Sequence, residues 1–453
     1  MDKYQLRTAA RALVLIPGAV IVYAIALHWV FVDLIQPTFA YSGYRYVPSS
    51  EIVVATTVVT AVVVAWFMPR RIRRPSAIIL WILYVVTVAP TILMSSYIGI
   101  LDPGPAMITS AGIGAAFIVV CLGVRRQKPT RPLFNRLSLT SFWLVIGAFT
   151  LFVYVYLALT AGLSLRFIAI LDVYDVREDY SETLGGAALL GYLVSTQANV
   201  INPLIFARGI YSRKVFPIAV AVLGQLVLYS GTGFKTIVFS IPSLLLVAWL
   251  FRANLRPRGV LFLGGAAGVI LVAATLDELT DGIIWSSLFA RRFLITPAML
   301  SAYYVDFYGT NGFEYLSHSI LSPFNDPTHP YGPARMIGLY IRGEVGMAAN
   351  ANLFADGFAQ FGWFGVAGIA ILLIIYLRVL DRAAYGLPTA VAALVVVMPS
   401  IALSNTSMLT SMLSHGLFAV LVVLAIAPRD GWGLARPKMP TYHRARVRVG
   451  SRT

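Results

Sequence analysis

Long hydrophobic blocks alternate along this chain with short polar segments. Most blocks contain about 20 residues, which lets an α-helix cross a hydrocarbon layer about 30 Å thick. A membrane β-barrel would instead alternate apolar and polar residues. The pattern predicts an all-α, polytopic membrane protein with about twelve transmembrane helices, at 12–35, 50–68, 76–97, 105–124, 138–161, 185–206, 215–230, 235–251, 259–276, 361–379, 387–404 and 409–427.

The polar segments differ in length. Most are short connectors, whereas 161–185 contains "LDVYDVREDYSE" and 277–360 is long enough to hold structure of its own. The chain shows no internal repeat and no separate soluble domain. We therefore predict one membrane domain over 1–453, with a long structured extracytoplasmic loop at 277–360 and a basic cytoplasmic tail at 429–453.

Charged residues are scarce, and their distribution is uneven. They make up 12% of the 453 residues, against about 25% in soluble domains, and the net charge is +16. Alternate connectors and the two ends hold 27 of the 35 lysines and arginines but only three of the 19 acids. Cytoplasmic loops of membrane proteins carry this excess. We therefore expect both termini in the cytoplasm, and no nucleic-acid partner.

Eight cations remain on the expected outer side: Arg45, Arg166, Arg177, Lys235, Arg291, Arg292, Arg335 and Arg342. Lys235 stands out because its segment, "YSGTGFKT", is a very short break between two hydrophobic runs. Its side chain could extend to the outer headgroups. Alternatively, it could neutralise an anionic ligand, and Gly231 and Gly233 would then allow a tight turn and close backbone approach.

Several common site motifs are missing. The segment "GTGFKT" lacks the spacing of a phosphate-binding P-loop. The five histidines show no i, i+4 pair, and Cys121 is the single cysteine, so we expect no metal site and no cofactor. His28 and His415 fall within predicted spans, where we expect packed or polar-network side chains.

The loop at 277–360 combines arginines, aromatic residues, carboxylates and an asparagine-rich turn. Aromatic rings beside Asn, Asp and His suit sugars, and arginine suits phosphate oxygens. An aromatic belt with headgroup-binding arginines is the alternative. An extracytoplasmic enzyme has no ATP, so it would need an activated donor such as a sugar on a polyprenyl diphosphate. Fixed cations would stabilise the departing diphosphate, and a carboxylate or histidine would take the proton from the hydroxyl group of the acceptor sugar.

Four stretches resemble the O-antigen, or oligosaccharide repeat-unit, polymerases: "LDVYDVRE", "YSGTGFKT", "RRFLITPAMLSAYYVDFY" and "NANLFADGFAQFGWFG". The resemblance implies a multi-pass protein of the bacterial inner membrane whose active face is extracytoplasmic. It implies a metal-independent glycosyltransferase that acts on polyprenyl-diphosphate-linked glycans within membrane lipid. A flippase and a chain-length regulator are the candidate protein partners.

The related O-antigen ligases offer a second comparison. They share a histidine, then Asn, Ser or Gln, nine residues and Gly-x-x-Gly. Here Asn352 precedes Gly362 and Gly365 at that spacing, but Ala351 occupies the histidine position. Alanine cannot accept a proton, which favours a polymerase over a ligase and leaves the general base unassigned.

By this resemblance, the diphosphate and glycan contacts are Arg177, Lys235, Arg291, Arg292, Arg335, Arg342, Asn350 and Asn352. The candidate catalytic groups are Asp356, Glu344 and, more weakly, His329. Each carboxylate has a structural alternative: a loop salt bridge with a neighbouring arginine for both, and for Asp356 also the cap of a re-entrant helix.

Two other classes stay open. A ligase or another lipid-linked glycosyltransferase is one, although the latter usually carry an acidic pair after the first span, where only isolated Asp33 and Glu51 occur. A transporter or lipid-linked glycan flippase is the other. Transporters usually show repeat symmetry and broken helices. Neither feature is visible in this sequence.

Overall fold

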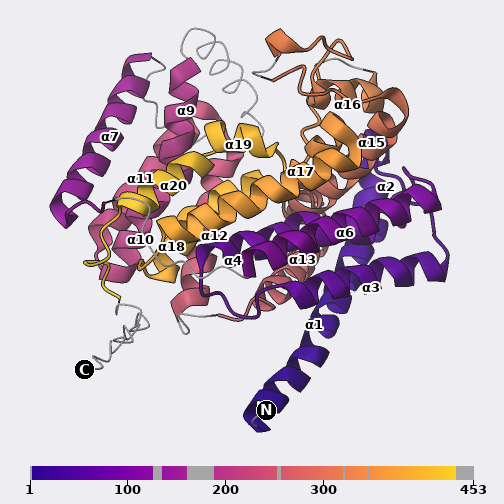
Figure 1. Cartoon of the computed structure of the whole chain (residues 1–453), viewed down its shortest axis with the longest axis horizontal. Coiled ribbons are helices and arrows are strands. Elements are labelled where there is room, and N and C mark those ends of the chain that lie inside the picture. The colour runs from indigo at the N-terminus through magenta and orange to yellow at the C-terminus, as the bar shows by residue number, and fades with distance from the viewer. Residues whose placement is uncertain are drawn as a thin grey trace, which may run out of the picture.

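The computed structural model describes residues 3–125, 135–160, 188–252, 257–319, 322–343 and 346–434. Within these ranges the chain is helical throughout, and the only β-type pairing recorded there is the isolated bridge between Arg71 and Arg258. Figure 1 shows one helical bundle, with α15 and α16 gathered at one end of α17. The all-α fold class is confirmed for the described residues.

Nine helical segments of the described chain are long and apolar enough to cross a membrane. They are α1 (Lys3–Val30) with its continuation to Ser42, α4 (Pro75–Leu83) with α5 (Ala89–Met94), α6 (Pro103–Arg125), α7 (Leu139–Thr160), α9 (Ala188–Thr196) with α10 (Asn202–Ser212), α11 (Val215–Thr232), α12 (Lys235–Arg252), α13 (Leu261–Leu279) and α17 (Leu353–Ala383).

The other predicted spans also correspond to helices, but less regular ones. The pair α19 (Met408–Ser414) and α20 (Leu417–Ile426) is bent by 55° and would make a tenth crossing. The helices α3 (Glu51–Phe67) and α18 (Thr389–Ala402) have only 17 and 14 residues. The apolar blocks therefore do form helices, while the number of twelve crossings stays a prediction.

Four helices widen into a π-helical turn immediately before a proline. Proline has no N–H group and its ring clashes with the carbonyl four residues earlier, so the backbone shifts to bonds five residues apart. At each site the N–H of the residue before proline donates to that more distant carbonyl. The turns are η1 (Phe31–Ile35), η3 (Tyr84–Val88), η4 (Gln197–Ile201) and η5 (Ser287–Ile295).

No broken helix was visible in the sequence, but the structure contains one at the pair of α19 and α20. The predicted span at 409–427 is interrupted at His415 and Gly416, and Gly416 has a φ of +87°. Glycine tolerates this left-handed conformation because it lacks a Cβ atom. The break brings the end of α19 to the same side of the bundle as the turn between α11 and α12.

The described residues of the segment 277–360 form several short helices. Between α13 and α17 it forms α14 (Ile284–Ser286), η5, α15 (Thr296–Asn311), η6 (Ser322–Phe324) and α16 (Pro333–Arg342). Most of α15, from Pro297 to Tyr308, is buried, and this helix packs against α5 and α17. It is therefore part of the helical packing, while the extracytoplasmic location of the segment stays a prediction.

A sharp kink divides α17 and explains its glycines. Phe361 and Gly362 leave helical geometry, and Gly362 has φ +59° and ψ −140°, which side-chain-bearing residues rarely adopt. The ring of Phe313 lies where a Cβ atom on Gly362 would be placed, at 2.7 Å. The bend also presses Gly365 against the carbonyl oxygen of Gly357, leaving no room for a side chain there.

The connectors that charge counting assigned to the cytoplasm meet at one end of the bundle, which we call the basic end. The Ile72 amide donates to Pro257 O at 3.0 Å, Arg378 donates to Gly123 O at 2.7 Å, and Thr389 Oγ1 donates to Arg73 O at 3.0 Å. These contacts place the connectors on one side of the bundle, while their cytoplasmic location stays a prediction.

Two buried charges hold the basic end together. The Asp381 carboxylate pairs with Arg74 at 3.3 Å and accepts from the Ser76 hydroxyl at 2.8 Å. The Arg429 guanidinium donates to four backbone carbonyls, including those of Ala383 and Leu424. Burial, and to a smaller extent nearby Arg136, lower the pKa of Arg429 to about 10, so it remains charged at neutral pH.

Candidate functional site

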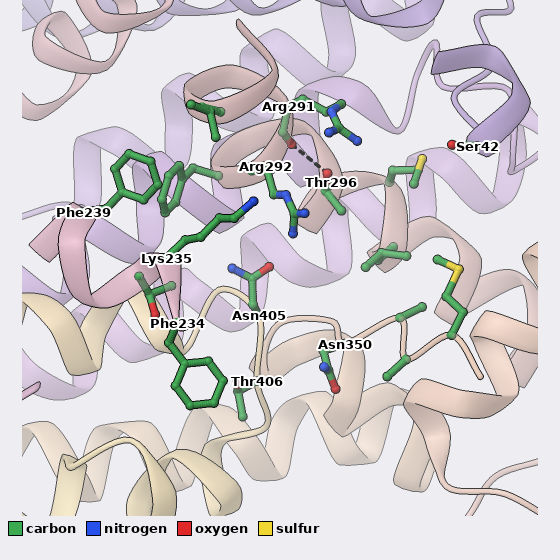
Figure 2. Close-up of a pocket in the computed structure, with 18 of the residues that line it drawn as sticks. Ser42, Phe234, Lys235, Phe239, Arg291, Arg292, Thr296, Asn350, Asn405 and Thr406 are labelled. Carbon is green, nitrogen blue, oxygen red and sulfur yellow. Dashed lines mark hydrogen bonds between the residues drawn. The ribbon is translucent and has the colours of Figure 1, made fainter. Parts of the chain in front are cut away.

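A pocket of about 530 Å³ lies at the end of the bundle opposite the basic end. Residues from several parts of the chain line it: Ser42 and Tyr44 after α2 (Gln36–Phe39), the start of α12, η5 with the start of α15, Arg342 with the stretch 347–350, the connector at 405–406, and His415. We call it the Lys235 pocket (Figure 2). It joins residues that are more than 350 positions apart in the sequence.

Four cationic side chains line this pocket: Lys235, Arg291, Arg292 and Arg342. The described residues that line it include no carboxylate. In Figure 2 the side chains of Lys235 and Arg292 point into the same space, above Asn405. Such an arrangement concentrates positive potential in a partly enclosed site and so favours an anionic ligand.

The local fold explains why Lys235 is at the pocket. Gly233 caps α11 with a φ of +64°, and its N–H donates to Tyr229 O at 2.9 Å. This reversal lets α12 begin at Lys235, so that the lysine occupies the first turn of a helix whose free N–H groups also favour anions. Gly231 makes no close approach to other residues, so of the two glycines only Gly233 is needed for the turn.

Neutral partners hold two of the arginines in place. Arg291 Nε donates to Ser287 Oγ at 2.9 Å, and the guanidinium lies 4.0 Å from the ring centroid of Phe39. Arg342 Nη2 donates to Ser42 Oγ at 2.7 Å. Hydroxyl and aromatic partners orient a guanidinium without cancelling its charge, so the positive charge remains available to a ligand.

Much of the pocket lining was not predicted, including the polar residues Asn405, Thr406 and His415. Asn405 and Thr406 belong to the connector before α19, and His415 lies in the break between α19 and α20. The polar run "SNTS" and the pair His415–Gly416 inside an apolar block were the available signals. Nδ1 of His415 is buried and has no hydrogen-bond partner within the described chain.

The structure brings together only part of the predicted site. Of the predicted contacts, Lys235, Arg291, Arg292, Arg342 and Asn350 line the pocket. Arg177 and Glu344 lie outside the described residues.

The other predicted residues lie elsewhere. Arg335 is exposed on α16 and does not line the pocket. Asn352 is fully buried as the N-cap of α17: its Oδ1 accepts from the Phe354 and Ala355 amides, and its Nδ2 donates to Ser301 Oγ at 2.6 Å. It is therefore a structural residue in this fold. Asp356 follows in the first turn of α17 and is absent from the pocket lining.

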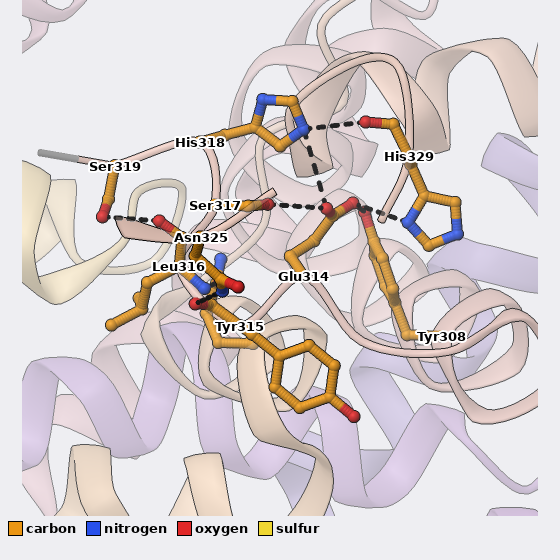
Figure 3. A network of polar contacts seen from close by, with 10 residues as sticks. Tyr308, Glu314, Tyr315, Leu316, Ser317, His318, Ser319, Asn325 and His329 are labelled. Carbon is orange, nitrogen blue, oxygen red and sulfur yellow. Dashed lines mark hydrogen bonds and ion pairs between the residues drawn. The ribbon is translucent and has the colours of Figure 1, made fainter. Parts of the chain in front are cut away.

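His329 belongs to a separate polar network around the buried carboxylate of Glu314 (Figure 3). Its Nδ1 lies 2.9 Å from Glu314 Oε1, and His318 Nε2 lies 3.6 Å from Glu314 Oε2. The Tyr308 hydroxyl donates to Glu314 Oε1 at 3.1 Å. Burial and the Glu314 charge raise the pKa of Tyr308, which keeps it a hydrogen-bond donor. The network ties the loop after α15 to that helix, and sequence reasoning missed Glu314.

The described residues contain no group of three or more histidine, cysteine or acidic side chains able to hold a metal ion. Comparisons of the chain with protein-family models, with curated proteins and with solved structures found no match. The chemistry of the Lys235 pocket is therefore the main guide to function.

Proposed function

We propose that this protein is a membrane glycosyltransferase that polymerises polyprenyl-diphosphate-linked oligosaccharide repeat units at the extracytoplasmic face. The observation that carries the proposal is the Lys235 pocket, in which four cations and no described carboxylate face one cavity among membrane helices. A diphosphate carries two or more negative charges and matches this site in sign. The resemblance to repeat-unit polymerases supports the same substrate class.

The pocket also suits the parts of the substrate that adjoin the diphosphate. Its volume of about 530 Å³ falls within the range of about 300–1,000 Å³ typical of ligand sites. Phe234, Phe239 and Leu288 provide an apolar wall for the first prenyl units. Asn350 and Asn405 provide amides that could bind sugar hydroxyls.

In the proposed reaction, a hydroxyl oxygen of the acceptor glycan attacks the anomeric carbon of the donor glycan. The bond between that carbon and the diphosphate oxygen breaks, and its electron pair leaves with the polyprenyl diphosphate. Lys235, Arg291 and Arg292 stabilise the negative charge that develops on this leaving group. The hydroxyl proton passes to a general base within hydrogen-bond reach.

His415 is the pocket residue best suited to act as that base. It is the one histidine among the described lining residues, which include no carboxylate, and neutral imidazole accepts a proton near pH 7. Of the two carboxylate candidates from the sequence, Asp356 does not line the pocket, and Glu344 lies outside the described residues. A histidine from the break between α19 and α20 would thus take the role for which Ala351 is unsuited.

A ligase or other lipid-linked glycosyltransferase would use the same pocket, and so would a flippase. The proposal is tested with purified full-length protein in proteoliposomes that contain lipid-linked repeat units. We expect ladders of linked units on a gel, without added nucleotide and in the presence of EDTA. Transport of single units across the vesicle membrane with no linkage would contradict the enzyme assignment, and transfer only to a different acceptor would indicate a ligase.

For the general base, we expect His415→Gln to lower kcat by about 10²–10⁴-fold, with the KM for the lipid-linked donor changed little, because a base acts in the chemical step. Asp356→Asn serves as the matched comparison and should retain more activity. The measurement is initial rate against donor concentration for each variant. Near-normal kcat in His415→Gln with loss of activity in Asp356→Asn would return the role to the carboxylate.

A further inference from the structure

Two adjoining pockets at the basic end have no part in the proposed reaction. The first, of about 360 Å³, is lined by Arg70, Arg71, Arg73, Arg74 and Arg125. The second, of about 390 Å³, shares Arg71 and adds Arg252 and Arg258. We call the first the Arg73 pocket. Lys235 begins α12 and Arg252 ends it, so about 27 Å of helix separates these arginines from the Lys235 pocket.

The arginines of the Arg73 pocket exceed the available acids. Asp381 is the carboxylate next to this pocket, and it pairs with Arg74. The other four, Arg70, Arg71, Arg73 and Arg125, form no ion pair within the described chain. Their charges are therefore not balanced by the described protein groups.

The backbone holds two of the arginines of these pockets, Arg71 and Arg258, next to each other. Arg71 and Arg258 are paired directly in an antiparallel bridge, a position where like charges are destabilising. The Ile72 amide donates to Pro257 O, the Gly259 amide donates to Arg70 O, and Trp81 Nε1 donates to Pro69 O at 2.8 Å. The loop is thus fixed in a conformation that an anion would stabilise.

The walls of both pockets are apolar as well as basic. Trp66, Phe67 and Leu80 line the Arg73 pocket, and Trp249 and Leu261 line its neighbour. Tryptophan is enriched at the level of lipid headgroups. A site for a soluble phosphate would not need such walls, whereas a phospholipid places its phosphate beside the arginines and its glycerol and acyl carbons against the apolar residues.

We propose that the Arg73 pocket binds the phosphate group of an anionic phospholipid, in the membrane leaflet opposite the Lys235 pocket. Basic pockets between membrane helices bind such headgroups because several cations converge on one phosphodiester. This site is independent of the proposed glycosyltransferase activity. It would neutralise the loop at 70–74 and fix the basic end against the membrane surface.

The test is native mass spectrometry of the full-length protein in detergent, titrated with phosphatidylglycerol or with phosphatidylethanolamine as the zwitterionic comparison. We expect Arg70→Gln with Arg73→Gln to weaken phosphatidylglycerol binding by about tenfold or more, because each cation near the surface contributes to it. The matched control, Lys214→Gln with Arg382→Gln, removes two charges from the same end outside the pocket and should leave binding unchanged.

Three outcomes would overturn the proposal. The first is an equal loss of phosphatidylglycerol binding in both double variants, and the second is unchanged phosphatidylglycerol binding in the pocket variant. The third is displacement of the lipid by millimolar inorganic phosphate, which would make the ligand a soluble phosphate. If the pocket variant fails to fold, Arg73→Gln alone and the charge-preserving Arg70→Lys with Arg73→Lys provide the comparison. The lysine pair should retain most of the binding.

Discussion

Replacing Arg292 with alanine should lower polymer formation by about 10²–10³-fold, because one fixed donor that stabilises developing charge contributes about 3–4 kcal/mol to the transition state. Arg292 lines the Lys235 pocket and, in Figure 2, points into the same space as Lys235. The measurement is the rate of linkage of lipid-linked repeat units by purified protein. The amount of folded protein in each preparation must be matched.

Arg335 provides the control for this prediction. It belongs to the same structured segment as Arg292 but is exposed on α16, outside the pocket lining. Arg335→Ala should keep the rate within about twofold of the original, since surface substitutions away from a site rarely matter. Equal loss in both variants would mean that net charge at this end, and not the pocket, is responsible. Normal chain length in Arg292→Ala would remove the diphosphate assignment.

Replacing Gly365 with alanine should destabilise the protein by about 3 kcal/mol, the upper end of the range of about 1–3 kcal/mol for overpacking a core, because the clash is with backbone, which has little freedom to move. The new methyl group would overlap the carbonyl oxygen of Gly357 across the kink of α17. The kink would have to open, which would shift the helix that Asn352 caps. Thermal unfolding in detergent, with the yield of monodisperse protein, measures the effect.

The same helix supplies the matched control. Gly368 is one turn further along α17, and a Cβ atom there would meet no atom within 4 Å. Gly368→Ala should be neutral or stabilising by up to about 1 kcal/mol, because alanine favours a helix more than glycine does. If both variants unfold at the same temperature as the original chain, Gly365 does not pack closely against Gly357 as described.

Much of this fold could be predicted because its signals are local. The apolar blocks predicted the helices. The uneven distribution of basic residues predicted that 70–74, 257–258 and 378–382 lie at one end of the bundle, where they meet. Prolines within or beside the apolar blocks mark the π turns in the sequence. The length of each crossing was less predictable, since α18 is shorter and the span at 409–427 is broken.

The candidate site was harder to predict because a side chain's role depends on where its helix faces. Asn352 and Asn350 are two residues apart, yet one is a buried helix cap and the other lines the pocket. Glu314 and His329 looked like separate polar residues of a loop but form one network around the buried Glu314 carboxylate. His415 looked like an ordinary packed residue of a span.

The sequence by itself therefore determined that this is a helical membrane protein with a basic end and a set of cations expected at the other end. Hydrophobic pattern, segment length and charge are properties of residues that are neighbours in the sequence, so they can be determined without knowledge of the fold. Only the tertiary structure decided which cations share a cavity, and that His415 and Asn405 join them. Those contacts connect residues tens to hundreds of positions apart, and they depend on a glycine turn, a π-helical turn and a broken span that together orient the side chains.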